Sequence, residues 1–202
     1  MDVQEKPKGK LRTGFTTGTS ATAASTAAIL SIINQKKIES VDVLLPKKDR
    51  IKININSCKF DKNKARCSVI KDGGDDPDVT HGAEIVVDLE LTTKPNSIEI
   101  DGGEGVGRVT KPGIGLEIGQ AAINPIPRKM ITENLTLTGK KILEKNGIKV
   151  VISVPKGKEL GPKTDNPRIG IVDGISILGT SGIVIPYSTA SFAAAIRQQI
   201  DV

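Results

Sequence analysis

Residues 71–82, KDGGDDPDVTHG, combine four carboxylates, three glycines and the only histidine of the chain. Carboxylates this close repel one another unless cations or amide donors balance them, and such crowding can raise a pKa. The segment therefore predicts a functional site, although a solvated acidic turn is the alternative, because Asp, Gly and Pro are common turn residues. The catalytic candidates in it are Asp75, Asp76 and His81, and the ligand-binding candidates are Asp72, Gly73, Gly74 and Asp78.

A single histidine supports neither a metal site nor a nucleophilic triad, so the sequence predicts no metal ion. A histidine that only makes hydrogen bonds within its loop is the alternative to a base at His81.

Residues 13–20, TGFTTGTS, precede an alanine-rich run that predicts a helix over 21–33. Hydroxyls and free amides at the positive end of a helix dipole can bind anions. The lysine of a phosphate loop is absent, and an ordinary capped helix start is the alternative. The binding candidates here are Thr16, Thr17, Gly18 and Ser20.

Three further polar segments follow. Residues 102–113, GGEGVGRVTKPG, are not a dinucleotide fingerprint, because the sequence Lys-Pro-Gly breaks the helix that such a site needs. Residues 124–128, NPIPR, contain two prolines that restrict the backbone, and residues 179–182 form a second hydroxyl-rich turn. The binding candidates in these segments are Gly103, Glu104, Gly105, Gly107, Arg108, Lys111, Asn124, Arg128, Thr180 and Ser181, and plain connecting turns are the alternative.

Hydrophobic periodicity predicts an α+β fold, in which a mixed, largely antiparallel sheet packs against a few helices. Alternating patterns indicate a hairpin of strands 39–45 and 50–56, and a charged turn places Cys58 opposite Cys67 as free thiols. The remaining expected strands are 65–71, 84–93, 97–101, 148–154 and 169–172, and the remaining helices are 129–145 and 189–200. The expected organisation is a mobile segment 1–10, a domain 11–188 and a helix 189–202 leading towards a missing domain.

Composition limits the classes of partner. The 202 residues carry a net charge of +6, which favours an anionic partner, but only 2% are aromatic, and single-strand recognition usually needs aromatic stacking. No apolar run approaches the length of a membrane span and no signal peptide is recognisable, so a cytoplasmic protein that binds neither membrane nor nucleic acid is expected. A non-catalytic basic α+β domain that binds nucleic acid or the ribosome remains the alternative.

The chain resembles the CbiD family, the cobalt-precorrin-5B C1-methyltransferases of anaerobic cobalamin biosynthesis. The matching segments are LRTGFTTGTSATAA, KDGGDDPDVTHG, GGEGVGRVTKPG, AINPIPRKMI, NPRIGI and ISILGTSGIV, in family order across residues 11–185. Ser20 stands where many members carry Cys, and Asp173 stands where Gly is usual. The resemblance implies a second, Rossmann-like domain that this chain lacks, so a corrinoid-binding half without turnover is a further possibility.

The resemblance implies methylation of a corrin carbon with S-adenosylmethionine as donor and with cobalt only as part of the substrate. The implied partners are the polyanionic tetrapyrrole and other enzymes of the pathway. Asp75, Asp76 and Asp78, with His81, are expected to place the cationic sulfonium. The candidates for binding the acidic arms of the substrate are Arg12, Arg108, Lys111, Arg128 and Arg168. The 71–82 segment, the 103–113 loop and the TTGTS turn are expected to share one cleft.

Overall fold

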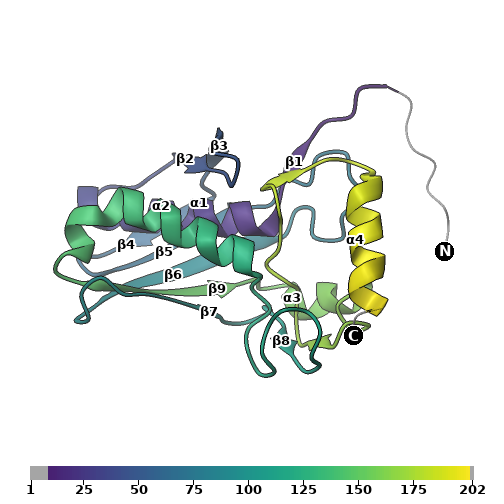
Figure 1. The fold of residues 1–202 in the computed structure, drawn as a ribbon. Coiled ribbons are helices and arrows are strands. Elements are labelled where there is room, and N and C mark those ends of the chain that lie inside the picture. Colours follow the sequence, from purple (N-terminus) through teal and green to yellow (C-terminus); the bar gives the residue numbers. More distant parts are fainter. Residues whose placement is uncertain (1–8, 201–202) are drawn as a thin grey trace.

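The computed structural model describes residues 9–200, so most of the expected mobile segment, residues 1–8, lies outside the described residues, as do residues 201 and 202 (Figure 1). Its centre is a sheet of five strands. Their spatial order is β4 (Ser57–Phe60), β5 (Lys64–Ile70), β6 (Glu84–Thr92), β9 (Gly147–Ser153) and β7 (Ile98–Gly102). All neighbours are antiparallel except β7 and β9, which run parallel. The predicted α+β class with a largely antiparallel sheet is confirmed.

Helices α1 (Thr17–Asn34) and α2 (Pro125–Leu143) cover one face of this sheet (Figure 1). Helix α1 packs against α2 and also against β5 and β6, and residues 17–29 are all buried. Its many alanines follow from this position, because a helix enclosed on all sides needs small apolar side chains over its whole circumference.

Both helices begin earlier than the sequence predicted. Helix α1 starts at Thr17 because the side chain of Thr16 accepts a hydrogen bond from the amide of Thr19 and caps the helix. Helix α2 starts at Pro125, and a proline is well suited to the first helical position, where its missing amide costs nothing.

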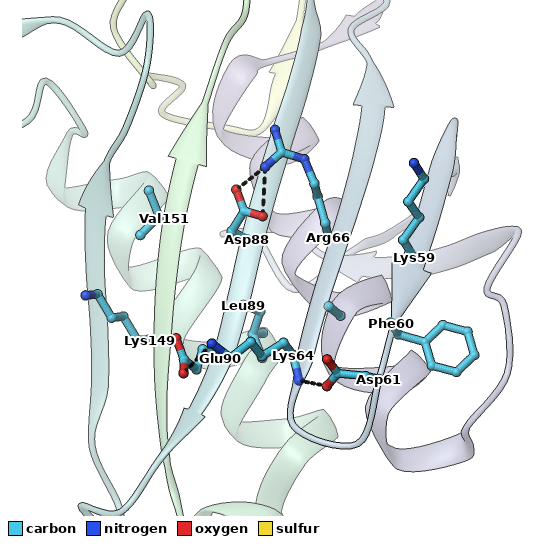
Figure 2. Close-up of a pocket in the computed structure, with 11 residues that line it drawn as sticks. Lys59, Phe60, Asp61, Lys64, Arg66, Asp88, Leu89, Glu90, Lys149 and Val151 are labelled. Atoms are coloured by element: carbon cyan, nitrogen blue, oxygen red, sulfur yellow. Dashed lines mark hydrogen bonds and ion pairs between the residues drawn. The ribbon is translucent and has the colours of Figure 1, made fainter.

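The other face of the central sheet carries charged side chains (Figure 2). Cross-strand ion pairs join Arg66 to Asp88 at 2.8 Å and Lys64 to Glu90 at 2.9 Å. An antiparallel sheet commonly buries one face and leaves the other in water, and this arrangement follows that pattern.

The hairpin formed by β2 (Ser40–Leu44) and β3 (Arg50–Asn54) is confirmed, and Cys58 lies directly opposite Cys67 between β4 and β5. Both cysteines are free, and burial raises the pKa of the Cys67 thiol well above its usual value.

Short elements complete the chain. They are β1 (Gly14–Phe15) paired with β11 (Ile183–Val184), β8 (Arg108–Val109) paired with β10 (Ile171–Val172), α3 (Gly157–Leu160), the 3-10 turn η1 (Gly161–Lys163) and α4 (Thr189–Ile200). The sequence indicated α4, and it placed Cys58 of β4 opposite Cys67, but it indicated none of β1, β8, β11, α3 or η1. No helix within residues 9–200 is long and apolar enough to cross a membrane.

Candidate functional site

The polar segments leave the central sheet at the same end. Ile70 at the end of β5 pairs with Glu84 at the start of β6, and Ser153 near the end of β9 pairs with Val86 of β6. Gly102 at the end of β7 pairs with Ile152 of β9. The loops that follow β5, β7 and β9 therefore begin side by side, at the end of the sheet nearer α4 in Figure 1.

The acidic loop, residues 71–82, is closed at its base by two backbone hydrogen bonds. The amide of Lys71 donates to the carbonyl of Ala83 at 2.9 Å, and the amide of Gly82 donates to the carbonyl of Lys71 at 2.8 Å. The acidic loop therefore continues the β5–β6 hairpin, and these two bonds hold its two ends together.

Lys71 is the residue of this loop that the sequence analysis missed. Only 1% of its side chain is exposed, and its Nζ donates to Oδ2 of Asp78 at 2.5 Å. The amide and hydroxyl of Thr80 donate to Oδ1 of the same carboxylate at 2.7 and 2.6 Å. Burial alone would raise the pKa of Asp78, but Lys71 and Thr80 together hold that pKa below its usual value.

A sequence signal for the burial of Lys71 does exist. Ala65, Cys67 and Val69 are buried at every second position of β5, and Lys71 continues the same face, although Ser68 on the opposite face is buried as well. Because side chains of a strand point alternately to opposite faces, the period of two places Lys71 on the core side.

Donors from other segments balance the remaining carboxylates of the acidic loop. The guanidinium of Arg12 binds Asp72, and this bond lowers the pKa of Asp72 against the opposing effect of partial burial. The amide of Arg12 donates to Oδ2 of Asp75 at 2.6 Å, and the amide of Tyr187 donates to Oδ1 of Asp76 at 2.9 Å. The carboxylates that suggested a functional site therefore also attach the acidic loop to two distant segments, one at Arg12 and one at Tyr187.

The backbone of β1 lies directly against the acidic loop. The amide of Phe15 donates to the carbonyl of Asp72 at 2.8 Å, and a Cβ atom on Gly14 would lie 2.2 Å from the carbonyl carbon of Gly73. Glycine is required at position 14 because any larger residue would push the two segments apart.

His81 makes its hydrogen bond within the acidic loop. Its Nδ1 accepts a hydrogen bond from the amide of Gly73 at 3.1 Å, so the imidazole binds the backbone of its own loop. Slightly more than half of the side chain is exposed. In this arrangement the histidine supports the loop, and its part in catalysis stays a prediction.

The TTGTS turn is buried, and its hydroxyls are bonded inside the protein. Thr17 donates to the carbonyl of Ser176 and accepts from the amide of Leu178, while Thr19 donates to the carbonyl of Gly182. Ser20 is fully buried and donates to the carbonyl of Thr16. These contacts attach the start of α1 to residues 176–182, and ligand binding by this turn stays a prediction.

The loop around 103–108 packs on residues 157 and 174. A Cβ atom on Gly105 would lie 2.0 Å from the carbonyl oxygen of Val154, and one on Gly174 would lie 2.3 Å from the carbonyl oxygen of Gly105. Glycines are therefore needed here for close backbone packing. Arg108 donates to Asp101 at 3.0 Å and to the carbonyl of Gly102 at 2.6 Å.

The other candidates have different surroundings. Arg128 is half-buried and donates to the carbonyls of Ile123 and Ile100, and burial lowers its pKa. Asn124 stands before α2 without a side-chain capping bond. Ser181 donates to the carbonyl of Ile183, and the neighbouring Thr180 is exposed. Glu104 and Lys111 are also exposed.

A pocket of about 520 Å³ lies between the acidic loop and the 162–168 loop. Asp76, Asp78 and Val79 form one part of its lining, and residues of the 162–168 loop, among them Lys163 and Arg168, form the other. The acidic loop thus contacts both β1, which directly precedes the TTGTS turn, and the 162–168 loop. Between residues 9 and 200, no ion pair joins Arg108 or Lys111 to the acidic loop, so one cleft shared by all three segments stays a prediction.

A second pocket, of about 500 Å³, lies on the charged face of the central sheet (Figure 2). It contains none of the predicted site residues. In the part of the chain that the structure describes, no three His, Cys, Asp or Glu side chains are grouped as a metal site would require.

The fold and the positions of the loops define an α+β domain with its glycine-rich and charged loops gathered beside one end of the sheet. Residues 3–186 match the model of the CbiD family, and the chain belongs to that family.

Relatives in this family are named cobalt-precorrin-5B C(1)-methyltransferase. The one from Geobacillus kaustophilus is 49% identical over 195 residues, which are 96% of this chain and 52% of the relative. The one from Leptospira interrogans serovar copenhageni is 50% identical over 193 residues, again 52% of its length. The chain therefore spans about half the length of these relatives.

A solved structure agrees with the family. The 1.9 Å crystal structure of cobalamin biosynthesis protein (cbiD) from Archaeoglobus fulgidus is 33% identical, with a TM-score of 0.67. The match covers 95% of this chain and 60% of that one.

Proposed function

We propose that this chain forms the first part of a methyltransferase that transfers a methyl group from S-adenosylmethionine to C1 of cobalt-precorrin-5B in cobalamin biosynthesis. The observation that carries the proposal is the 49% identity to a relative of that name over nearly the whole chain. The clustering of the acidic, hydroxyl-rich and glycine-rich segments at one end of the sheet supports it.

Methyl transfer from a sulfonium to a ring carbon needs alignment and exclusion of water more than it needs a strong base. The acidic loop suits that task, because Lys71, Arg12 and the amide of Tyr187 hold its carboxylates in fixed positions. The carboxylates would place the cationic donor by electrostatic attraction.

The substrate carries acidic arms, and exposed cations at this end of the sheet could bind them. Arg168 and Lys111 are exposed, and Arg108 is partly so. Arg12 is exposed as well, although its guanidinium already pairs with Asp72. Arg128 is a weaker candidate than the sequence indicated, because its guanidinium already donates to two carbonyls.

The part of the relatives that this chain does not cover, about half of their length, is included in the proposal as a second domain. In helix α4, Phe192, Ile196 and Ile200 are exposed, with 70%, 43% and 76% of their surface accessible. A second domain would cover this apolar side of the helix. The cytoplasmic location and the contacts with other pathway enzymes stay predictions.

A chimera tests the proposal. In the Geobacillus kaustophilus relative, the matching 195 residues would be replaced by this chain, and transfer of labelled methyl from S-adenosylmethionine to cobalt-precorrin-5B would be measured. We expect the chimera to turn over and the chain alone to show little or no activity. A folded chimera without activity would contradict the proposal, and full activity of the chain alone would show that the second half is not needed.

A further inference from the structure

The pocket between the acidic loop and the 162–168 loop contains three carboxylates and two cationic side chains. Two of the carboxylates already have ion-pair partners. Asp78 pairs with the buried Lys71 at 2.5 Å, and Asp165 pairs with Arg168 at 3.1 Å. Among the lining residues, and counting only ion pairs within residues 9–200, the charges left unpaired are Asp76 and Lys163.

These two charges still have bonding capacity. Oδ1 of Asp76 accepts from the amide of Tyr187, which leaves Oδ2 with its lone pairs. Lys163 is exposed and carries three donor hydrogens. One free carboxylate oxygen and one free ammonium in a single pocket match a ligand that carries an ammonium and a carboxylate of its own.

The rest of the lining suits a small organic zwitterion. Val79, Pro162 and Pro167 supply apolar surface for the carbon chain of a ligand. The volume of about 520 Å³ lies within the range of small-molecule pockets. Charge-assisted hydrogen bonds at two points would fix the orientation of the ligand as well as bind it.

We infer that this pocket binds the zwitterionic amino-acid end of a small ligand, with the ammonium at Asp76 and the carboxylate at Lys163. The inference rests on the proposed function for the identity of that ligand, which is the methyl donor with its methionine end in the pocket. It assigns Lys163 a binding role that the sequence analysis did not give it. It also removes Arg168 from the candidates for binding the substrate, because Arg168 lines the donor pocket, and leaves Arg108 and Lys111 for that role.

Calorimetric titration of the 202-residue chain tests this assignment with two probes. S-adenosylhomocysteine carries the amino-acid end, whereas 5′-methylthioadenosine lacks it. We expect S-adenosylhomocysteine to bind at least about tenfold more tightly, a difference of about 1.4 kcal/mol. The variant Lys163→Met should bind S-adenosylhomocysteine about tenfold more weakly, because it loses a charge-assisted bond, and its affinity for 5′-methylthioadenosine should not change.

Two further variants complete the test. Asp76→Asn keeps an oxygen that can accept from the amide of Tyr187 but removes the charge, so it should weaken only the binding of S-adenosylhomocysteine. Lys149→Met is the matched control, because Lys149 lines the pocket on the charged sheet face and is likewise exposed (Figure 2). It should bind both probes as the unchanged chain does.

Equal affinity for both probes, no binding of S-adenosylhomocysteine, or unchanged binding by Lys163→Met would each overturn the pocket assignment. The chimera assay separates this outcome from failure of the proposed function. If the chimera methylates cobalt-precorrin-5B while Lys163→Met leaves the KM for S-adenosylmethionine unchanged, only the pocket assignment is wrong. If Lys163 is needed for binding but no methyl transfer occurs, the pocket assignment stands and the function fails.

Discussion

Lys71 shows how a charged side chain can define the shape of a polar loop. It continues the buried face of β5, and its pairing with Asp78 offsets the cost of removing its charge from water. The carboxylates of the loop accept further hydrogen bonds from Arg12, from backbone amides and from Thr80. The sequence could show the number of charges, but not which donors would balance them, and one of these donors lies more than a hundred residues away along the chain.

Replacing Lys71 should therefore destabilise the whole domain. Lys71→Met leaves Asp78 without its buried partner, and we expect the free energy of unfolding to fall by about 3 kcal/mol. Urea denaturation gives this value, and Lys149→Met on the exposed sheet face is the control, with a change within about 0.5 kcal/mol. A similar small change for both variants would show that the buried ion pair contributes little.

The pKa of Asp78 makes this contribution dependent on pH. The pKa in the folded protein is lower than the unfolded value of about 3.9, so the carboxylate adds stability above that value. The added stability is lost as the pH falls through the lower, folded pKa. The difference in unfolding free energy between the unchanged chain and Asp78→Asn should thus be full at pH 7 and shrink below about pH 4. A difference that stays constant from pH 7 to pH 3 would argue against this linkage.

At the scale of elements, the sequence predicted most of what local periodicity can specify. The alternation of β5 and β6 and the hairpin β2–β3 are as expected, because each of these strands buries one face. The strand expected at 169–172 is only two residues long, since the amide of Ile171 bonds back to the carbonyl of Asn166. The two-residue pairs β1–β11 and β8–β10 join distant segments, and no local pattern announces such contacts.

The start of α1 depends on one of these distant contacts. The hydroxyl of Thr17 donates to the carbonyls of Ser176 and Leu178 and accepts from the amide of Leu178. Thr17→Val would leave buried groups unpaired, so we expect a loss of about 1–3 kcal/mol in the free energy of unfolding. Thr17→Ser keeps the hydroxyl and should lose much less. Equal losses in both variants, measured by thermal denaturation, would contradict this role of the hydroxyl, because only Thr17→Val removes it.

At the scale of the whole molecule, the net charge of +6 still calls for a test against nucleic acid. The acidic loop and the scarcity of aromatic side chains both oppose strong binding to RNA. We expect a filter-binding titration to show no sub-micromolar affinity at moderate salt. Tight binding that weakens steeply with salt would favour the nucleic-acid alternative.

The family match extends over residues 3–186, and the acidic loop is the part of it in which we place the chemistry. Asp76 is central to that chemistry, because it lines the pocket and its carboxylate also accepts a hydrogen bond from the amide of Tyr187. Asp76→Asn keeps the hydrogen bond to that backbone, so the folded structure and its stability should change little, while the charge that we assign to donor placement is lost.

The rate of methyl transfer by the chimera with and without Asp76→Asn tests the central claim most directly. With saturating cobalt-precorrin-5B, we predict that the variant loses about tenfold in kcat/KM for S-adenosylmethionine, because it lacks the charge that we assign to the ammonium of the donor. Its unfolding curve should match that of the unchanged chimera. Methyl transfer at an unchanged rate in the variant would contradict the account and would leave the acidic loop with a structural role alone.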